Sequence, residues 1–325
     1  MLINDSGDSP VSEISESGLI LYILYSIIMN MTKRFCSVIV FFVLLAWGVN
    51  AQNVMAPIKA RLDGVDARVG VAVIAPDGEM AVLNNQHRFP LMSVMKLHQA
   101  VAVLDSVGRS GVLSLDTPVR ITTDMLLKDT WSPMRDSFPD GTVMPLAEVL
   151  RYSLQQSDNN ACDILFDLFG TPVQMDSVLR SKGLDGFKIA YTEDDMHRDV
   201  NRSYDNCSTP LGVAQLIDRL LKWELLGVDE TMFLVKTLAG CSTGNARIGG
   251  ASLPAGTTIG HKTGTGDRNS RGKIIGVNDA GFVKVPGEAP YTLVVLVQDS
   301  GLSMAETERL IADISTIVYR YYMEK

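Results

Sequence analysis

The chain has 325 residues, enough to bury a large core in one or two packed units. Charged residues make up 20% of it, its formal net charge is −8, and no basic cluster appears, so a nucleic-acid-binding surface is not expected. The four histidines and four cysteines show none of the spacings of a zinc site or a disulfide framework. We therefore expect neither a metal nor another cofactor.

The first 51 residues combine two patterns. Residues 1–28 contain acidic residues, no Lys or Arg, and a final apolar run. The basic pair Lys33-Arg34, a second apolar run and the small residue Ala51 then follow in the order of a secretory signal peptide. We interpret residues 29–51 as a signal peptide cut after Ala51, and residues 1–28 as lying upstream of the true start. A membrane anchor is the alternative, but the basic pair interrupts the apolar stretch.

The part of the chain that follows begins with a short helix, expected to end within residues 61–68. Residues 69–74 and 79–83 predict two strands of a hairpin. A helix with one apolar face begins just after Pro90, and helices then dominate to about residue 226. We expect them at residues 146–156, 159–169, 173–182 and 211–225.

Strand character returns near residue 251, and a closing helix is expected at residues 304–322. Strands are predicted at residues 257–265, 272–277 with 281–285, and 291–298, with a turn at Asn278-Asp279. These elements predict an α/β (α+β) fold in which helices flank a five-stranded, mostly antiparallel sheet. The α/β domain would comprise residues 52–86 and 227–325, and residues 87–226 would form an inserted all-helical domain.

Ser93 and Lys96 lie three residues apart at the start of the helix after Pro90, so their side chains share one face and can touch. A helix start also favours negative charge near its free N–H groups. A hydroxyl, an amine and the free N–H groups of a helix start are together the parts of an activated nucleophile. A Ser-x-x-Lys match is weak by itself, because Ser270-Arg271-Gly272-Lys273 repeats it, and a solvated helix face is the alternative.

Three more short elements follow in the chain, each next to an expected helix, loop or strand. They are Ser157-Asp158-Asn159, Glu193, and Lys262-Thr263-Gly264-Thr265. With the four elements in this order, residues 55–322 resemble a class A serine β-lactamase. The resemblance implies the fold shared by serine β-lactamases and penicillin-binding proteins.

The resemblance also implies the catalytic roles. Ser93 attacks the β-lactam carbonyl and becomes acylated, while the backbone N–H groups of Ser93 and Thr265 hold the oxyanion. Lys96 takes the proton of Ser93 or orients its hydroxyl, and whether Lys96 or Glu193 is the acylation base stays open. Ser157 passes a proton to the departing lactam nitrogen.

The substrate-binding residues are implied in the same way. The amide of Asn159 holds the acylamide carbonyl of the substrate. Lys262, Thr263 and Thr265 bind the substrate carboxylate, and Gly264 allows the close backbone approach that this requires.

Three other positions are less specific. Arg271 matches a carboxylate-binding arginine found in part of the family, and a solvated arginine is an equal alternative. Trp131 resembles an aromatic gate beside the pocket, with a core tryptophan as the alternative. Cys241 begins a stretch that predicts a turn, with no nucleophilic partner beside it.

Glu193 decides between a hydrolase and its relatives, because an acyl-enzyme persists unless a base activates water against it. An exposed loop acid is the alternative. The usual family pattern has Arg two residues before this glutamate, Asn four after and Asp thirteen after, whereas this chain has Tyr191, His197 and Asn206. A subgroup of extended-spectrum, cephalosporin-hydrolysing members shares these replacements. They imply a rearranged loop, a wider pocket and a water held partly by His197.

The sequence therefore predicts a periplasmic, monomeric, cofactor-free β-lactam hydrolase that acts through an acyl-serine, favours cephalosporins and confers antibiotic resistance. Its partner would be a small β-lactam, with no nucleic acid and no membrane involved after signal cleavage. A D-Ala-D-Ala peptidase or other penicillin-binding protein is one alternative, and a non-enzymatic β-lactam sensor domain is the other.

Overall fold

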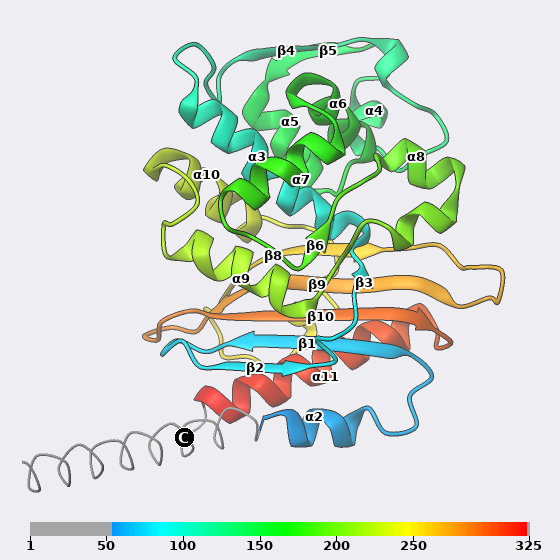
Figure 1. Cartoon of the computed structure of the whole chain (residues 1–325), viewed down its shortest axis with the longest axis vertical. Helices are drawn as coiled ribbons and strands as arrows, with labels where there is room; N and C mark the ends of the chain where they lie inside the picture. The colour runs from blue at the N-terminus through cyan, green and yellow to red at the C-terminus, as the bar shows by residue number, and fades with distance from the viewer. Residues whose placement is uncertain (1–53, 324–325) are drawn as a thin grey trace, which may run out of the picture. The chain divides into compact units, whose positions relative to one another are not determined.

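A computed structural model describes residues 54–323. At its centre is a five-stranded sheet in the order β2-β1-β10-β9-β8, in which all neighbouring strands are antiparallel (Figure 1). The predicted five-stranded, mostly antiparallel sheet is confirmed. Its strands are β1 (Arg68–Ile74), β2 (Met80–Leu83), β8 (Thr258–Thr265), β9 (Ile274–Lys284) and β10 (Tyr291–Ser300).

Helices cover both faces of this sheet. Successive side chains of its central strands therefore enter two different apolar clusters, one on each face. In β10, Val294 belongs to the cluster that contains α9 (Pro210–Leu221). The next residue, Val295, belongs to the cluster that contains α11 (Met304–Met323) and α2 (Met55–Arg61). The uninterrupted apolar runs in the sequence therefore correspond to strands without a solvated face.

The segment between β2 and β8 is mostly helical, as predicted. Three of the expected helices have boundaries within one residue of those predicted, but α9 ends four residues early, just before Trp223 with its positive φ of 61°. Helix α10 was not predicted. The helices here, besides α9, are α3 (Met95–Arg109), α4 (Pro133–Ser137), α5 (Leu146–Gln155), α6 (Asn159–Phe169), α7 (Pro172–Ser181), α8 (Glu193–Arg198) and α10 (Val228–Ala239).

Shorter elements connect these helices. Two small sheets have the strand orders β3-β7-β6 and β4-β5. Their strands are β3 (Phe89–Pro90), β6 (Phe187–Lys188), β7 (Cys207–Ser208), β4 (Pro118–Ile121) and β5 (Thr142–Pro145). The 3-10 turns are η1 (Met92–Val94), η2 (Thr123–Met125), η3 (Val200–Tyr204) and η4 (Ile248–Gly250).

The predicted turn at Asn278-Asp279 is wrong, because β9 continues through both residues. The side-chain amide of Asn278 donates to the carbonyls of Pro90 and Leu91 at 2.8 and 3.0 Å, and Asp279 lies 2.8 Å from Nδ1 of His261. Both side chains are fully buried. Partners from other strands and loops satisfy these polar groups, so they can occupy the middle of a buried strand.

The proposed leader, residues 1–51, lies outside the described residues. Among residues 54–323, no helix is both long and apolar enough to cross a membrane. The division of the chain into an α/β domain and an inserted helical domain stays a prediction.

Candidate active site

Ser93 lies in a strained turn that leads into α3. The residue before it, Met92, has a positive φ of 49°, which is uncommon for a residue with a side chain. Strand β8 approaches the turn so closely that a Cβ atom at Gly264 would lie 2.6 Å from the Leu91 carbonyl oxygen and 3.2 Å from the Ser93 nitrogen. A glycine is therefore required where β8 passes Ser93, and outside contacts hold the strained turn in place.

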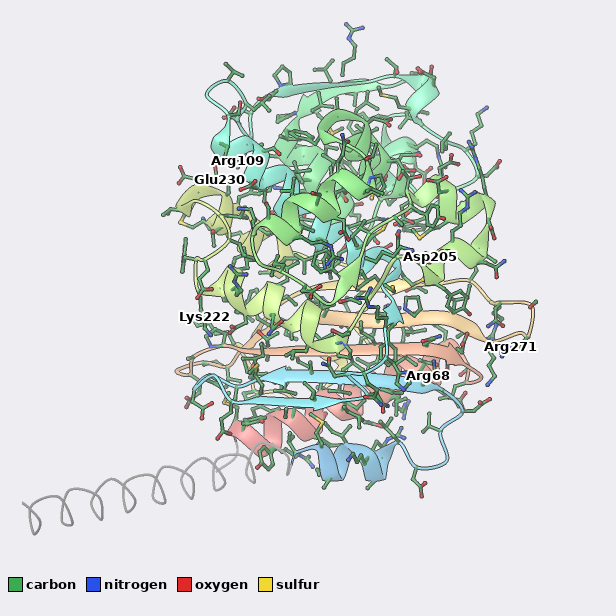
Figure 2. The ribbon with its side chains drawn as sticks, in the orientation of Figure 1. Arg68, Arg109, Asp205, Lys222, Glu230 and Arg271 are labelled. Carbon is green, nitrogen blue, oxygen red and sulfur yellow. The ribbon has the colours of Figure 1, made fainter. Side chains whose placement is uncertain are left out.

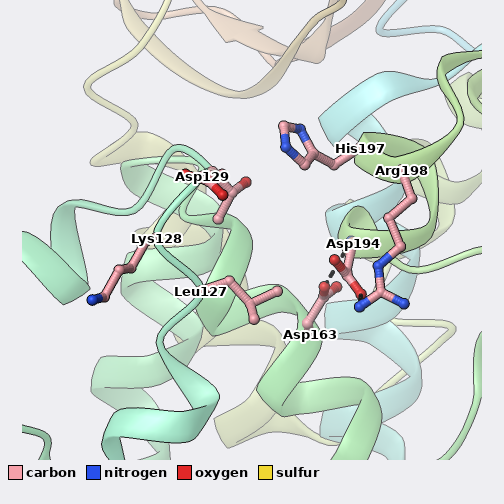
Figure 3. A pocket seen from close by; sticks show the side chains of 8 residues that line it. Leu127, Lys128, Asp129, Asp163, Asp194, His197 and Arg198 are labelled. Carbon is pink, nitrogen blue, oxygen red and sulfur yellow. Dashed lines mark hydrogen bonds and ion pairs between the residues drawn. The ribbon is translucent and has the colours of Figure 1, made fainter.

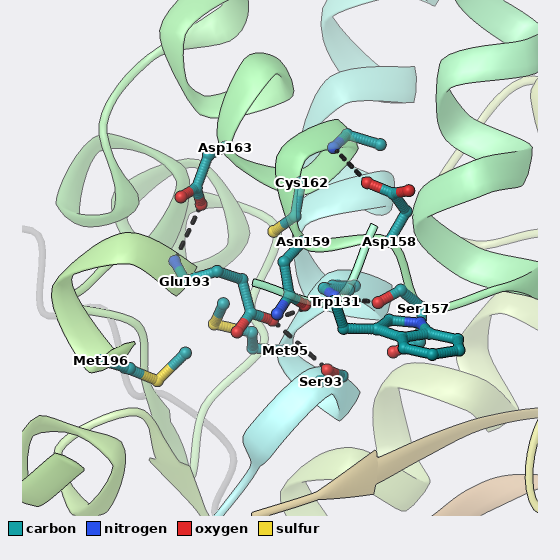
Figure 4. Close-up of polar contacts among 12 residues, drawn as sticks. Ser93, Met95, Trp131, Ser157, Asp158, Asn159, Cys162, Asp163, Glu193 and Met196 are labelled. Atoms are coloured by element: carbon teal, nitrogen blue, oxygen red, sulfur yellow. Dashed lines mark hydrogen bonds and ion pairs between the residues drawn. The ribbon is translucent and has the colours of Figure 1, made fainter. Parts of the chain in front are cut away.

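Lys96 and Glu193 meet beside the Ser93 hydroxyl. Figure 4 shows the carboxylate of Glu193 directed toward Ser93. The fully buried Lys96 Nζ donates to the Ser157 carbonyl and to Asn159 Oδ1, both at 2.7 Å, and lies 3.0 Å from Glu193 Oε1. The Ser93 Oγ donates to the same Glu193 oxygen at 3.3 Å. Three acceptors around one ammonium offset the cost of burying its charge. The carboxylate of residue 193 thus contacts both the hydroxyl and the amine.

Ser157 reaches the same place from the loop between α5 and α6, where its own positive φ of 58° turns the chain. The Lys262 Nζ donates to Ser157 Oγ at 2.9 Å and to the Thr263 carbonyl at 2.8 Å. Burial, together with the nearby charge of Lys96, lowers the pKa of Lys262 to about 7. Asp158 caps α6 with its carboxylate and so fixes this loop.

Two cavities adjoin Ser93, one on the side of Ser157 and one on the side of Glu193. The first has a volume of about 260 Å³ and the second of about 100 Å³. The first is lined by Ser93, Trp131, Ser157, Thr243, Thr263 and Thr265. The second includes Ser93, Asn159, Glu193, Met196, His197 and Thr265 in its lining. The serine hydroxyl therefore separates a space for a substrate from a smaller space that suits water.

Trp131 and Arg271 differ in their relation to these cavities. Trp131 is 62% exposed, donates from its ring nitrogen to the Gln156 carbonyl at 2.9 Å and lines the larger cavity, so it is not a core residue. Arg271 lies at the surface, in the loop between β8 and β9 (Figure 2), and pairs with Asp299 at 3.5 Å. Arg271 is not among the residues that line either cavity.

A different arginine, Arg247, lies buried against β8, next to Gly264 and Thr265. Its guanidinium is buried and donates to the Gly264 carbonyl at 3.0 Å and to Thr265 Oγ1 at 2.6 Å. Arg247, which also pairs with Glu308 at 3.2 Å, thus places its guanidinium directly behind the strand that carries Lys262 and Thr263. Arg247 was not predicted, because no local sequence pattern distinguishes a buried arginine in a loop from a solvated one.

The loop that carries Glu193 is held by two side chains from outside it. Asp163 on α6 accepts the backbone N–H groups of Glu193 and Asp194, each at 2.8 Å. Asn206 accepts those of Ala190 and Tyr191 at 2.8 and 3.0 Å. Burial and the charge of Glu193 raise the pKa of Asp163 to about 7. The contacts of Asn206 stand where the usual family pattern would place an Arg–Asp pair, and those of Asp163 are additional.

The role of Asp163 in holding the loop was also not predicted, although its spacing from Asn159 could have indicated it. Asp163 follows Asn159 by four residues on α6, so the two side chains share one face of the helix. His197 lies at the end of α8 and contributes to the small cavity beside Glu193. It also lines a pocket of about 280 Å³ between Lys128, Asp129 and Arg198 (Figure 3).

Comparisons with known proteins agree with this geometry. The model of the β-lactamase enzyme family matches residues 53–322. A β-lactamase of Bacteroides uniformis is 37% identical over 89% of this chain and 99% of its own length. The extended-spectrum β-lactamase PER-1 of Pseudomonas aeruginosa is 34% identical over 82% of this chain and 87% of its own. The crystal structure of a class A β-lactamase from Bacteroides cellulosilyticus is 38% identical and superposes with a TM-score of 0.81, covering 85% of this chain and 99% of that one.

The fold and the clustered Ser93, Lys96 and Glu193 are those expected of a serine hydrolase. The chain belongs to the β-lactamase enzyme family and, within it, to class A. It is a serine β-lactamase, which hydrolyses β-lactams and thereby gives resistance to these antibiotics. The peptidase and sensor alternatives are not supported.

Proposed function

We propose that Ser93 is the nucleophile and that Glu193 activates the water that releases the product. The Ser93 Oγ attacks the lactam carbonyl while its proton leaves into the Lys96–Glu193 pair, in which either group can accept it. The C–N bond breaks, and the nitrogen takes a proton from Ser157. Lys262 replaces that proton through their 2.9 Å hydrogen bond and is reprotonated by solvent, while the Lys96–Glu193 pair releases the Ser93 proton to solvent before deacylation. Before Ser93 loses its proton, Lys96 holds the negatively charged carboxylate of Glu193 at 3.0 Å, beside the Ser93 hydroxyl.

Deacylation follows on the opposite side of Ser93. A water in the small cavity attacks the ester carbonyl and gives its proton to Glu193, which passes this proton to Ser93 Oγ as the ester bond breaks. His197 contributes to this cavity and helps to hold the water. The observation that carries the proposal is that one carboxylate oxygen touches both the nucleophile and Lys96 beside a space of water size.

Substrate binding is proposed for the larger cavity. Lys262, Thr263 and Thr265 hold the substrate carboxylate, with the charge of Arg247 behind them. Asn159 offers its amide to the acylamide carbonyl. The exposed indole of Trp131 forms one wall. The geometry supports Arg247 rather than Arg271 as the arginine that assists carboxylate binding.

The Glu193→Gln variant tests the assigned base. Mass spectrometry should show the intact enzyme carrying one drug molecule, stable for many wild-type turnover times, because glutamine cannot accept the proton of water. Asp194→Asn removes a neighbouring loop acid that pairs with Arg198 and serves as the matched control. If Glu193→Gln turns over as fast as this control, Glu193 is not the base.

We propose that cephalosporins are preferred over penicillins, since the loop at residues 190–206 is fastened by Asp163 and Asn206 and leaves the cavity beside Trp131 open. PER-1, a relative, is named an extended-spectrum enzyme. The comparison of kcat/KM for one cephalosporin and one penicillin decides this point. Equal or inverted values would contradict it.

We also propose an exported, periplasmic and monomeric enzyme that begins at Gln52. The basic–apolar–small order of residues 29–51 supports export, and the match to the family from residue 53 supports the start. N-terminal sequencing of the protein released from the periplasm, with its mass in solution, tests both points. A mature start well before Gln52, or a dimer at micromolar concentration, would contradict them.

A further inference from the structure

A second group of reactive side chains lies beside the substrate cavity and takes no part in the proposed hydrolysis. The thiol of Cys241, which follows α10, lies beside His261 on β8, because Thr243 contacts both Cys241 and Thr263 and the side chain of Thr263 shares a face of β8 with that of His261. Nδ1 of His261 lies in turn 2.8 Å from Asp279 Oδ1 on β9. The expectation that Cys241 has no partner is therefore wrong, because β8 brings in a histidine from a distant part of the sequence. The thiol, the imidazole and the carboxylate thus form a spatial row in which the carboxylate can orient the imidazole beside the thiol.

The charges in this group favour the thiolate. Although burial opposes it, the charge and hydrogen bond of Asp279, with the hydrogen bond of Cys241, raise the pKa of His261 to about 10. The imidazolium and Lys262 in turn lower the pKa of the Cys241 thiol to about 7, against the effect of burial. Burial raises the thiol pKa at Cys162 and at Cys207. Cys241 is thus the reactive thiol among the described residues.

Two threonines connect this thiol to the substrate cavity. The Cys241 Sγ lies 3.4 Å from Thr243 Oγ1, which lies 2.5 Å from Thr263 Oγ1. Thr243 and Thr263 both line the 260 Å³ cavity. Cys241 is partly exposed, whereas Cys162 has no exposed surface. A group attached to Sγ would therefore lie at the edge of the cavity that the substrate carboxylate is proposed to occupy.

We propose that Cys241, His261 and Asp279 form a modification site that captures small anionic disulfides, and that the mixed disulfide obstructs the carboxylate-binding end of the substrate cavity. The Cys241 thiolate attacks one sulfur of the reagent, so that a new S–S bond forms and the original one breaks. The other sulfur leaves as a thiolate with the bonding electron pair and takes a proton from water. The positive charges of His261 and Lys262 select a reagent that carries carboxylates.

The first experiment measures labelling, which does not depend on the roles proposed for hydrolysis. The full chain is treated with 3,3′-dithiodipropionate or with the cationic disulfide cystamine, and peptide mass spectrometry gives the rate at each cysteine. Each rate is divided by the rate of the same reagent with a free model thiol. Cys241 should react at least about tenfold faster than Cys207, its rate should titrate with a midpoint near pH 7, and the anionic reagent should be favoured.

Two variants separate the site from an ordinary surface thiol. In His261→Asn the midpoint of the labelling profile should rise by about one pH unit or more, because the imidazolium is lost. Lys262→Gln should remove the preference for the anionic reagent. The wild-type profile alone keeps the proposal testable if His261→Asn does not fold. Equal labelling of Cys241 and Cys207, a midpoint near that of an ordinary thiol, or a preference for cystamine overturns the proposal.

The second experiment measures obstruction, and it rests on the proposed substrate-binding role of Lys262 and Thr263. Cephalosporin hydrolysis should fall in proportion to the fraction of Cys241 modified, mainly through KM, and dithiothreitol should restore it. The variant Cys241→Ser should be insensitive to the disulfide, and Cys207→Ser should remain sensitive. Full labelling at Cys241 with unchanged hydrolysis would refute the obstruction while leaving the thiolate site and the hydrolytic mechanism standing.

Discussion

The two sides of Ser93 are built in different ways. On the β8 side, the catalytic atoms belong to buried strands and helix starts, and Gly264 and Asn278 lock the backbone around the nucleophile. On the other side, Glu193 sits on the short helix α8 in a long loop, which side chains of Asp163 and Asn206 fasten to the rest of the molecule. We infer that forming the acyl-enzyme depends on the rigid framework around β8 and the start of α3. Its hydrolysis depends on the few contacts that hold the loop carrying Glu193.

The largest effect is expected on the framework side. Ser93→Ala should lower kcat for cephalosporin hydrolysis by about 10⁴-fold or more, because no covalent intermediate can form. A spectrophotometric assay checks this. Ser270→Ala is the matched control, since Ser270 belongs to the second Ser-x-x-Lys match of the sequence. Loss of activity in the control, or its survival in Ser93→Ala, would contradict the assignment.

The next largest effect is expected on the loop side. In Asp163→Asn one of the two acceptors for the N–H groups of Glu193 and Asp194 becomes a donor, which should lower kcat by roughly 10- to 100-fold at pH 7.5. Asp167→Asn, one turn further along α6, should leave kcat unchanged.

The same carboxyl gives a pH dependence with a defined sign. The pKa of Asp163 is raised to about 7, so the wild-type residue loses one acceptor oxygen as the pH falls through 7. The kcat of the wild type should therefore fall on the acid side, and Asp163→Asn should show a lower, flatter profile there. An acid limb unchanged by the substitution would exclude this residue as its origin.

A smaller, roughly tenfold effect is expected at alkaline pH on the framework side. The pKa of Lys262 is lowered to about 7, so its positive charge is present below pH 7 and is lost as the pH rises through that value. The kcat/KM for a carboxylate-bearing cephalosporin should fall above pH 7, mainly through KM. In Lys262→Arg, whose guanidinium keeps its charge, this alkaline decline should disappear. Persistence of the decline in Lys262→Arg would assign it to another group.

The smallest effect is expected at the cavity wall. Trp131→Ala removes an exposed indole that touches the substrate space from one side, so KM should rise by about two- to tenfold with little change in kcat. Trp223→Ala, at another half-exposed tryptophan, is the control. A large loss of kcat or of thermal stability in Trp131→Ala would show that the indole supports the structure instead.

The sequence was informative wherever chemistry follows from local spacing. Ser93 and Lys96 could be paired because three residues bring side chains together on a helix, and the strand carrying Lys262 could be recognised from its β-branched threonines and Ile259. Contacts from distant segments could not be inferred. Asn278-Asp279 has the composition of a turn, yet their partners in other segments keep both residues within a strand. The burial of Arg247 depends on the same kind of contact.

Single-turnover kinetics of Asp163→Asn tests most directly the claim that the two sides of Ser93 are separable. Time-resolved mass spectrometry after mixing with a cephalosporin yields the rate constants for forming and losing the acyl-enzyme. The account predicts formation at close to the wild-type rate and a lifetime about 10- to 100-fold longer. An equal slowing of both steps, or a slow enzyme that never accumulates the acyl adduct, would contradict it.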